Sequence, residues 1–190
     1  MAQARTLNEQ EVQQVLDHIN TRKHAARDRT MLLVSHLSGM RVGEIAALTV
    51  GHVLDATDQI RWEIRLTAEQ TKGKHPRTVF LNKRVREVLA AYVERIRIDD
   101  RERTLFPTQK NPRKGFSSNT LTQHFADLYK GAGLDGATSH SGRRTYATKI
   151  ASQGVGLRVL MRLMGHRHVS TTAVYIDAND DMLRRAVELA

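Results

Sequence analysis

The chain has 190 residues, 40% of them hydrophobic, which is enough for one packed core and short of what two full domains need. Thirty Lys and Arg against twenty Asp and Glu give a formal charge of +10, so we expect a polyanion as partner. The absence of cysteine excludes disulfides, thiolate metal sites and a cysteine nucleophile, and no apolar run is long enough to predict a membrane span or a signal peptide.

The first part of the chain has helical patterns. Thr6 and Glu9 have the spacing of a capping box, and the apolar residues that follow predict a helix over residues 7–20. A second helix is predicted over 25–38, with Gly39 as its left-handed C-cap, and a short third helix over 42–48. Arg41 lies between these last two helices.

The period then changes to that of a strand. Apolar and polar residues alternate from Gln59 to Thr67, which predicts a half-buried strand whose inward residues are Ile60, Trp62, Ile64 and Leu66. A turn over 71–76 and a second strand over 78–81 complete a small antiparallel hairpin with Lys72 near its tip.

The remainder of the chain returns to helices. Asn82 is the predicted N-cap of a helix that reaches Ile96, and the polar, breaker-rich residues 99–117 are expected to form a loop within the same domain. Further helices are predicted over 118–131, 140–153, 157–164 and 180–189. The fold class expected is therefore mainly α with a small antiparallel β-sheet, in one domain covering residues 1–190.

Several separated motifs carry polar residues that suggest chemistry. In Ser139-His140-Ser141-Gly142-Arg143 an imidazole and a guanidinium stand one helical turn apart, which suits a phosphate. Gly39-Met40-Arg41-Val42-Gly43-Glu44 lies upstream, and Gly165-His166 precedes Tyr175 by nine residues. This order of Arg, hairpin Lys, His-x-x-Arg, Gly-His and Tyr resembles the tyrosine recombinase family of phage integrases and Xer-type and Cre-type site-specific recombinases. The resemblance extends over about residues 6 to 177.

The resemblance implies an activity and a set of site residues. It implies a catalytic domain that cleaves and rejoins double-stranded DNA through a 3′-phosphotyrosyl intermediate on Tyr175, with no metal and no cofactor. The catalytic residues that it implies are Arg41, Lys72, His140, Arg143, His166 and Tyr175. Lys74 is the alternative for the hairpin lysine.

Phosphodiester exchange suggests a role for each group. Arg41 and Arg143 can clamp the non-bridging oxygens of a pentacoordinate phosphorus, and His166 can add a hydrogen bond. A phenol has a pKa of about 10, so Tyr175 needs a proton acceptor, for which His140 is the candidate. Lys72 is the expected proton donor to the departing 5′ oxygen.

Two groups of neighbours complete the expected site. Glu44 stands one helical turn after Arg41, where its carboxylate can hold the guanidinium, the alternative being an ordinary surface pair. Other cations are expected to contact phosphates away from the cut and to confer salt dependence. They are Lys74, Lys83, Arg84, Arg86, Lys110, Arg113, Lys114 and Arg144.

Further expectations concern organisation and alternatives. The motifs begin almost at Met1, so the family's N-terminal core-binding domain is expected to be absent, in an excised domain or in a short single-domain recombinase. We expect a cytoplasmic, nucleoid-associated protein without membrane contact, monomeric in solution and tetrameric on DNA. Residues 180–190 either exchange with a neighbouring subunit or fold back on their own core. Relaxation of DNA in the manner of type IB topoisomerases and a non-catalytic DNA-binding regulator are the alternative functions.

Overall fold

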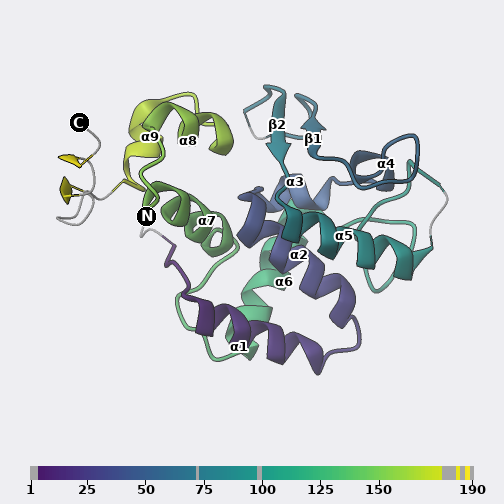
Figure 1. The fold of residues 1–190 in the computed structure, drawn as a ribbon. Coiled ribbons are helices and arrows are strands. Elements are labelled where there is room, and N and C mark those ends of the chain that lie inside the picture. The colour runs from purple at the N-terminus through teal and green to yellow at the C-terminus, as the bar shows by residue number, and fades with distance from the viewer. Residues whose placement is uncertain (1–3, 72, 98–99, 177–182, 185–186, 189–190) are drawn as a thin grey trace.

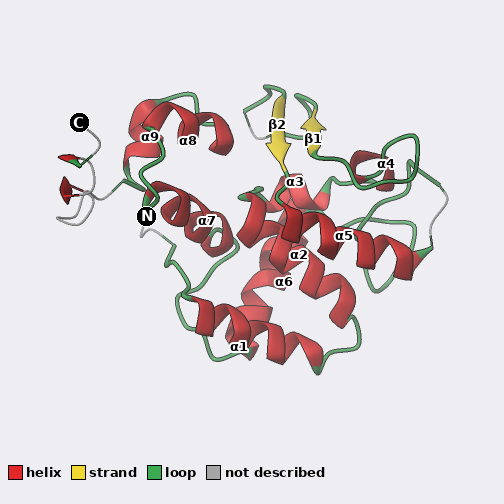
Figure 2. Cartoon of the chain, viewed as in Figure 1, coloured by secondary structure: helices red, strands yellow, loops and turns green. Residues whose placement is uncertain are grey.

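The computed structural model describes residues 4–71, 73–97, 100–176, 183–184 and 187–188 (Figure 1). Its helices are α1 Glu9–Asn20, α2 Ala25–Ser38, α3 Val42–Ala46, α4 Val50–Val53, α5 Lys83–Ile96, α6 Ser118–Gly131, α7 Ser141–Ala151, α8 Leu157–Met164 and α9 Val169–Ala173. Strands β1 Glu63–Leu66 and β2 Arg77–Phe80 pair antiparallel, with Glu63 opposite Phe80 and Leu66 opposite Arg77 (Figure 2). The predicted fold class, mainly α with a small antiparallel sheet, is confirmed.

Two clusters of buried side chains organise the fold. The large cluster takes residues from every element between α1 and α6 and from the loop before α6, where Leu105 and Phe106 are fully buried. The small cluster joins α7 to α8 through Ala147, Ala151 and Leu160, and Tyr175 packs against it. In Figure 1, α8 and α9 accordingly lie over α7, on one side of the hairpin.

A glycine lets α7 approach the central helix α2. A Cβ at Gly142 would clash with the Ser35 hydroxyl and would lie 2.8 Å from Cδ2 of His36. Any larger residue would therefore force the Ser35 and His36 side chains of α2 to shift in a packed region. Because α2 leads directly into Arg41 and α7 carries Arg143, this close packing brings two distant motifs together.

Helix α1 begins two residues later than its apolar pattern predicts. Asn8 is the N-cap, and its capping box joins Asn8 and Glu11, so the predicted box of Thr6 and Glu9 is wrong. The later start leaves Leu7 outside the helix, where its side chain enters the core at 4% exposure. Burial of this apolar residue before the cap favours the observed start.

The hairpin differs from its prediction at its open end. Trp62 is 71% exposed, so the expectation that it faces inward is wrong, whereas Ile64 and Leu66 are buried. Residues 60–62 precede the strand ladder, and the Trp62 ring is covered by the Arg86 guanidinium, whose Cζ lies 3.4 Å from the ring centroid. A cation–π contact thus takes the place of core packing.

Further differences concern short helices, apart from shifts of one or two residues at the ends of β2 and α7. The predicted helix 42–48 ends at Ala46, and α4 and α9 have no counterpart among the predictions because four or five residues are too few to show a helical period. The predicted helix 180–189 lies largely outside the described residues. In the part of the chain that the structure describes, no helix is long and apolar enough to cross a membrane.

Candidate active site

Arg41 is held in place by Glu44. It is the N-cap of α3, and its Nη1 donates to Oε1 of Glu44 at 2.9 Å. Its backbone N–H donates to Oε2 of the same carboxylate at 2.7 Å. The Glu44 side chain is only 1% exposed, so this contact, expected from the spacing, is buried and is not a surface pair.

A second arginine completes the environment of Glu44. Arg77, at the start of β2, donates from Nε and Nη2 to the two oxygens of the Glu44 carboxylate at 3.0 and 2.8 Å. Burial alone would raise the pKa of Glu44, but the charges and hydrogen bonds of Arg77 and Arg41 lower it. Arg77 is not among the residues expected from the sequence motifs. The available signal was its position two residues before buried Val79, since a charged residue on the inward face of a strand requires a partner.

Arg143 is buried where α7 meets two other parts of the chain. Its guanidinium donates to the carbonyl oxygens of Gly39 and Met164, and Nη2 lies 3.1 Å from Nε2 of His166. Burial first, and then the nearby charges of Arg41 and Arg77, lower the pKa of Arg143 to about 9. The group therefore stays charged at neutral pH.

His166 follows the left-handed C-cap Gly165 of α8. Its Nε2 contacts Arg143, and its Nδ1 lies 2.9 Å from Oγ1 of Thr172. A guanidinium can only donate, so Nε2 accepts and Nδ1 carries the proton. Burial, followed by the charges of Arg143, Arg41 and Arg77, lowers the pKa of His166 to about 4, so the ring is neutral at neutral pH. Thr172, fully buried on α9, was not singled out from the sequence, which offers no local signal for this contact.

Tyr175 lies beside these groups in the same chain. Its ring stacks on the His166 ring, with centroids 5.9 Å apart and planes inclined by 18°. A pocket of about 210 Å³ next to it is lined by Ala4, His140, Arg143, Arg144, Val174 and Tyr175. His140, the exposed N-cap of α7, thus faces the same hollow as the phenol ring.

The structure therefore gathers five of the six expected catalytic residues into one region. Arg143 contacts His166, which stacks on Tyr175, and His140 shares their pocket. Arg41 joins them through Nη2, which lies 3.5 Å from the carbonyl oxygen of Gly165. The sixth, Lys72, lies outside the described residues.

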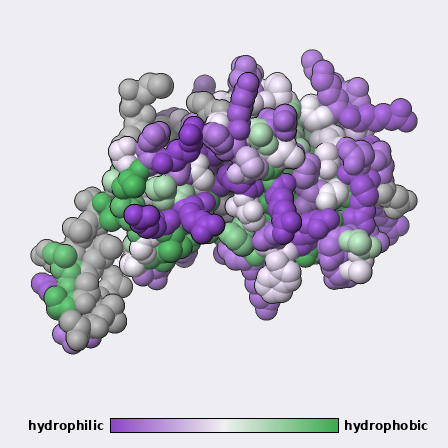
Figure 3. Space-filling model, turned by 90° about the horizontal axis from the view of Figure 1, so that it is seen from above, coloured by the Kyte–Doolittle hydropathy of each residue, from purple (hydrophilic) through white to green (hydrophobic). Residues whose placement is uncertain are grey.

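The other expected cations are spread over the surface. Lys74, in the left-handed region at φ 50°, is exposed, as are Lys83, Arg84, Lys110, Arg113 and Lys114. Arg144 differs from the expectation that it lies away from the cut, because its Cζ is 5.9 Å from the Tyr175 ring centroid. Seen from above, the molecular surface is largely hydrophilic (Figure 3).

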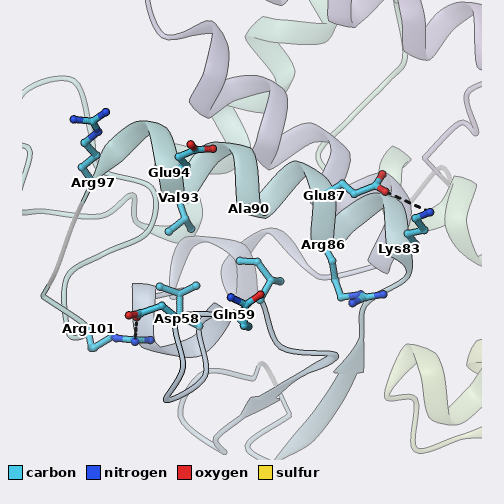
Figure 4. Close-up of a pocket in the computed structure, with 12 residues that line it drawn as sticks. Asp58, Gln59, Lys83, Arg86, Glu87, Ala90, Val93, Glu94, Arg97 and Arg101 are labelled. Atoms are coloured by element: carbon cyan, nitrogen blue, oxygen red, sulfur yellow. Dashed lines mark hydrogen bonds and ion pairs between the residues drawn. The ribbon is translucent and has the colours of Figure 1, made fainter.

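A second hollow lies elsewhere and has another character. A groove of about 1300 Å³ runs along the outer face of α5, with apolar Ala90 and Val93 between acidic and basic side chains (Figure 4). It contains Lys83 and Arg86 and none of the six expected catalytic residues. Among the described residues there is also no cluster of three His, Asp or Glu side chains that could hold a metal ion.

Comparison with known proteins shows the family of this chain. A model of the phage integrase family matches residues 5–182. The tyrosine recombinase XerA of Thermococcus kodakarensis is 30% identical over 98% of this chain and 62% of its own length, and XerA of Pyrococcus furiosus is 27% identical with the same coverage. The chain thus spans about three fifths of these relatives.

Solved structures show the same fold. A crystal structure of a XerA recombinase superposes with a TM-score of 0.75 and 25% identity, covering all of this chain and 66% of the other. The integrase of transposon Tn1549, solved in complex with transposon right end DNA, superposes with a TM-score of 0.74 at 19% identity. With the family match extending over nearly the whole sequence, the chain belongs to the phage integrase family and has the catalytic-domain fold of tyrosine recombinases.

Proposed function

We propose that this chain cleaves and rejoins DNA strands as a site-specific recombinase, with the phenol of Tyr175 as the nucleophile. The observation that carries the proposal is the stacking of Tyr175 on His166, which itself contacts buried Arg143. The nucleophile, a permanent cation and an imidazole thus meet in one chain. The named relatives are recombinases and integrases, which favours strand exchange over the alternative of simple DNA relaxation.

The proposed reaction conserves the number of phosphoester bonds. The Tyr175 oxygen attacks the phosphorus, a bond between that oxygen and phosphorus forms, and the bond from phosphorus to the 5′ oxygen breaks. His140 accepts the phenolic proton, and a hairpin lysine supplies a proton to the leaving 5′ oxygen. A 5′ hydroxyl of another strand can then attack the 3′-phosphotyrosyl group and reverse these steps.

The pocket suits a phosphate in size and charge. At about 30 Å³ per water molecule, its volume of about 210 Å³ holds roughly seven waters, enough room for a phosphate group. Arg143 and Arg144 line the pocket, and a guanidinium is a planar donor suited to phosphate oxygens. The contact of Arg41 with the Gly165 carbonyl is long, at 3.5 Å, so a phosphate oxygen would displace it at little cost.

Double-stranded DNA is the proposed partner. The formal charge of +10 and the exposed cations around Lys110 and Arg113 favour binding to phosphates. The Tn1549 integrase was solved bound to DNA, which supports the same partner for this fold. We propose that the protein forms a tetramer on DNA and acts at the nucleoid. Exchange of residues 180–190 between subunits stays a prediction.

The decisive experiment traps the covalent intermediate. Nicked duplexes with randomised sequence around the scissile phosphate are incubated with the protein, and DNA-linked protein is detected on a denaturing gel. We expect an adduct with the wild type and with the control variant Tyr92→Phe. In the wild type the Tyr92 hydroxyl donates to the Leu105 carbonyl inside the core. Tyr175→Phe should form none. Equal adduct with Tyr175→Phe would refute Tyr175 as the nucleophile. No adduct with any of the proteins, while they still bind the DNA, would favour the non-catalytic regulator.

A leaving-group test distinguishes the two hairpin lysines. We propose that Lys72 donates the proton, so Lys72→Ala should slow cleavage strongly. A substrate with a 5′-bridging sulfur, whose thiolate leaves without a proton, should restore the rate. Lys74→Ala serves as the matched variant two residues away. If Lys74→Ala shows the rescue and Lys72→Ala does not, the assignment of the donor is wrong.

A further inference from the structure

Arg77 has all three of its guanidinium nitrogens bonded inside the protein. Nε and Nη2 bind the two oxygens of Glu44, and Nη1 donates to the carbonyl of Leu163 at 2.9 Å. Its side chain is 8% exposed. Unlike Arg143, Arg77 does not line the pocket beside Tyr175, so we expect its contribution to pass through the groups that it holds.

The C-terminal end of α8 is held by three arginines from three elements. The successive carbonyls of Leu163, Met164 and Gly165 accept from Arg77, Arg143 and Arg41, in that order. The last carbonyls of a helix lack partners within the helix, and its partial negative charge attracts cations. The next residue is His166, so these bonds determine where that imidazole lies.

The same arginine supports the carboxylate that holds Arg41. Glu44 receives two hydrogen bonds from Arg41 and two from Arg77 while nearly excluded from water. Without Arg77, one cation alone would have to compensate this buried charge. Arg41 would then be drawn further towards Glu44 and away from the pocket.

The stem of Arg77 is fitted against Gly165. A Cβ at Gly165 would lie 2.6 Å from Cδ of Arg77, and Gly165 also adopts a left-handed φ of 59° as the C-cap of α8. A lysine at position 77 could follow the stem. Its single ammonium nitrogen could not span both carboxylate oxygens and a carbonyl in fixed planar geometry.

We propose that Arg77 is a positioning residue that fastens Glu44 to the end of α8 and so aligns Arg41 with His166 around the phosphate. The inference rests on the proposed function of this site. Arg77 is not one of the six expected catalytic residues, and in this proposal it joins the hairpin, α3 and α8.

The kinetic test compares Arg77→Lys with Arg65→Lys. Arg65 lies on β1 of the same hairpin, with 84% of its side chain exposed and an ion pair to Glu63. At saturating nicked DNA we expect Arg77→Lys to lower the single-turnover cleavage rate about 10- to 100-fold, the usual effect of losing a supporting contact. The half-saturating DNA concentration should stay within about twofold, because Arg77 does not touch DNA. Arg65→Lys should match the wild type. A wild-type maximal rate for Arg77→Lys overturns the proposal.

A second measurement needs no DNA. In ¹⁵N-labelled protein, Arg77→Lys should shift the imidazole signals of His166 and the amide signal of Gly165, while Arg65→Lys leaves both unchanged. Unchanged signals in Arg77→Lys contradict the positioning role. If the signals shift but the wild type forms no adduct, the proposed function fails while the role of Arg77 in the free protein stands.

A double variant covers loss of folding. Should Arg77→Lys unfold, Arg77→Met with Glu44→Met removes both buried charges together, a replacement that buried pairs often tolerate. Because Glu44 also holds Arg41, the reference for this protein is Glu44→Met alone. A purely structural role of Arg77 predicts equal maximal cleavage rates for the double variant and Glu44→Met. Positioning predicts a slower double variant, and equal rates would overturn it.

Discussion

Replacing Glu44 by Gln tests the buried network directly. The carboxylate accepts hydrogen bonds at both oxygens, from Arg41 and from Arg77. An amide can accept at only one of these atoms, because its nitrogen carries hydrogens that would face the N–H donors. The substitution keeps the shape of the side chain and removes the negative charge to which both guanidiniums are bonded.

The expected loss of stability follows from burial. Breaking a buried ion pair on one side costs about 3–5 kcal/mol. In a domain of this size each kcal/mol lowers Tm by about 2–4 °C, so Glu44→Gln should lower Tm by roughly 6 to 20 °C. Glu63→Gln is the matched control, because its partner Arg65 is 84% exposed and a surface pair contributes less than about 1 kcal/mol.

Urea denaturation at several pH values provides the assay. The folded-state pKa of Glu44 is lowered, so its stabilisation is fully present above the unfolded pKa of about 4.3 and is lost as pH falls through the folded value. The difference in unfolding free energy between wild type and Glu44→Gln should therefore be widest near neutral pH and narrow in acid. A difference no larger than that of Glu63→Gln, or one that grows in acid, would refute the reasoning.

Three further predictions concern neighbouring groups. His166 should titrate near pH 4 in an NMR titration, so the cleavage rate should show no inflection from this ring near its ordinary value of 6.5, and titration near 6.5 would contradict the buried, cation-surrounded environment. Thr172→Val should remove the partner of Nδ1 and slow cleavage about 10- to 100-fold, with recovery in Thr172→Ser and no effect of Thr171→Val on the exposed side of the same helix. Gly142→Ala should destabilise the fold by about 1–3 kcal/mol in urea denaturation because its Cβ meets the Ser35 hydroxyl, and unchanged stability would show that the Ser35 and His36 side chains move aside without cost.

Local patterns account for the parts that were predicted well. The helices over residues 25–38 and 118–131 agree with α2 and α6 because each is long enough to show an apolar period, and Gly39 marks the end of the first. The short helices α4 and α9 were missed because they contain too few residues to show such a period. The prediction that Trp62 faces inward was wrong because alternation shows on which face of a strand a residue would lie but does not show where the strand begins.

The sequence by itself determined the order of the motifs and the fold class, since these depend on spacing within short segments, and the resemblance to tyrosine recombinases implied which residues act on a phosphate. Only the tertiary structure decided that Arg77 lies between Glu44 and α8, and that His166 finds Thr172 on one side and Arg143 on the other. The contact from Arg41 to Gly165 joins residues 124 positions apart. Such contacts follow from how α7 packs on α2 and how α8 packs on α7. Packing between distant segments produces no periodicity or spacing in the sequence, so the sequence alone does not predict these contacts.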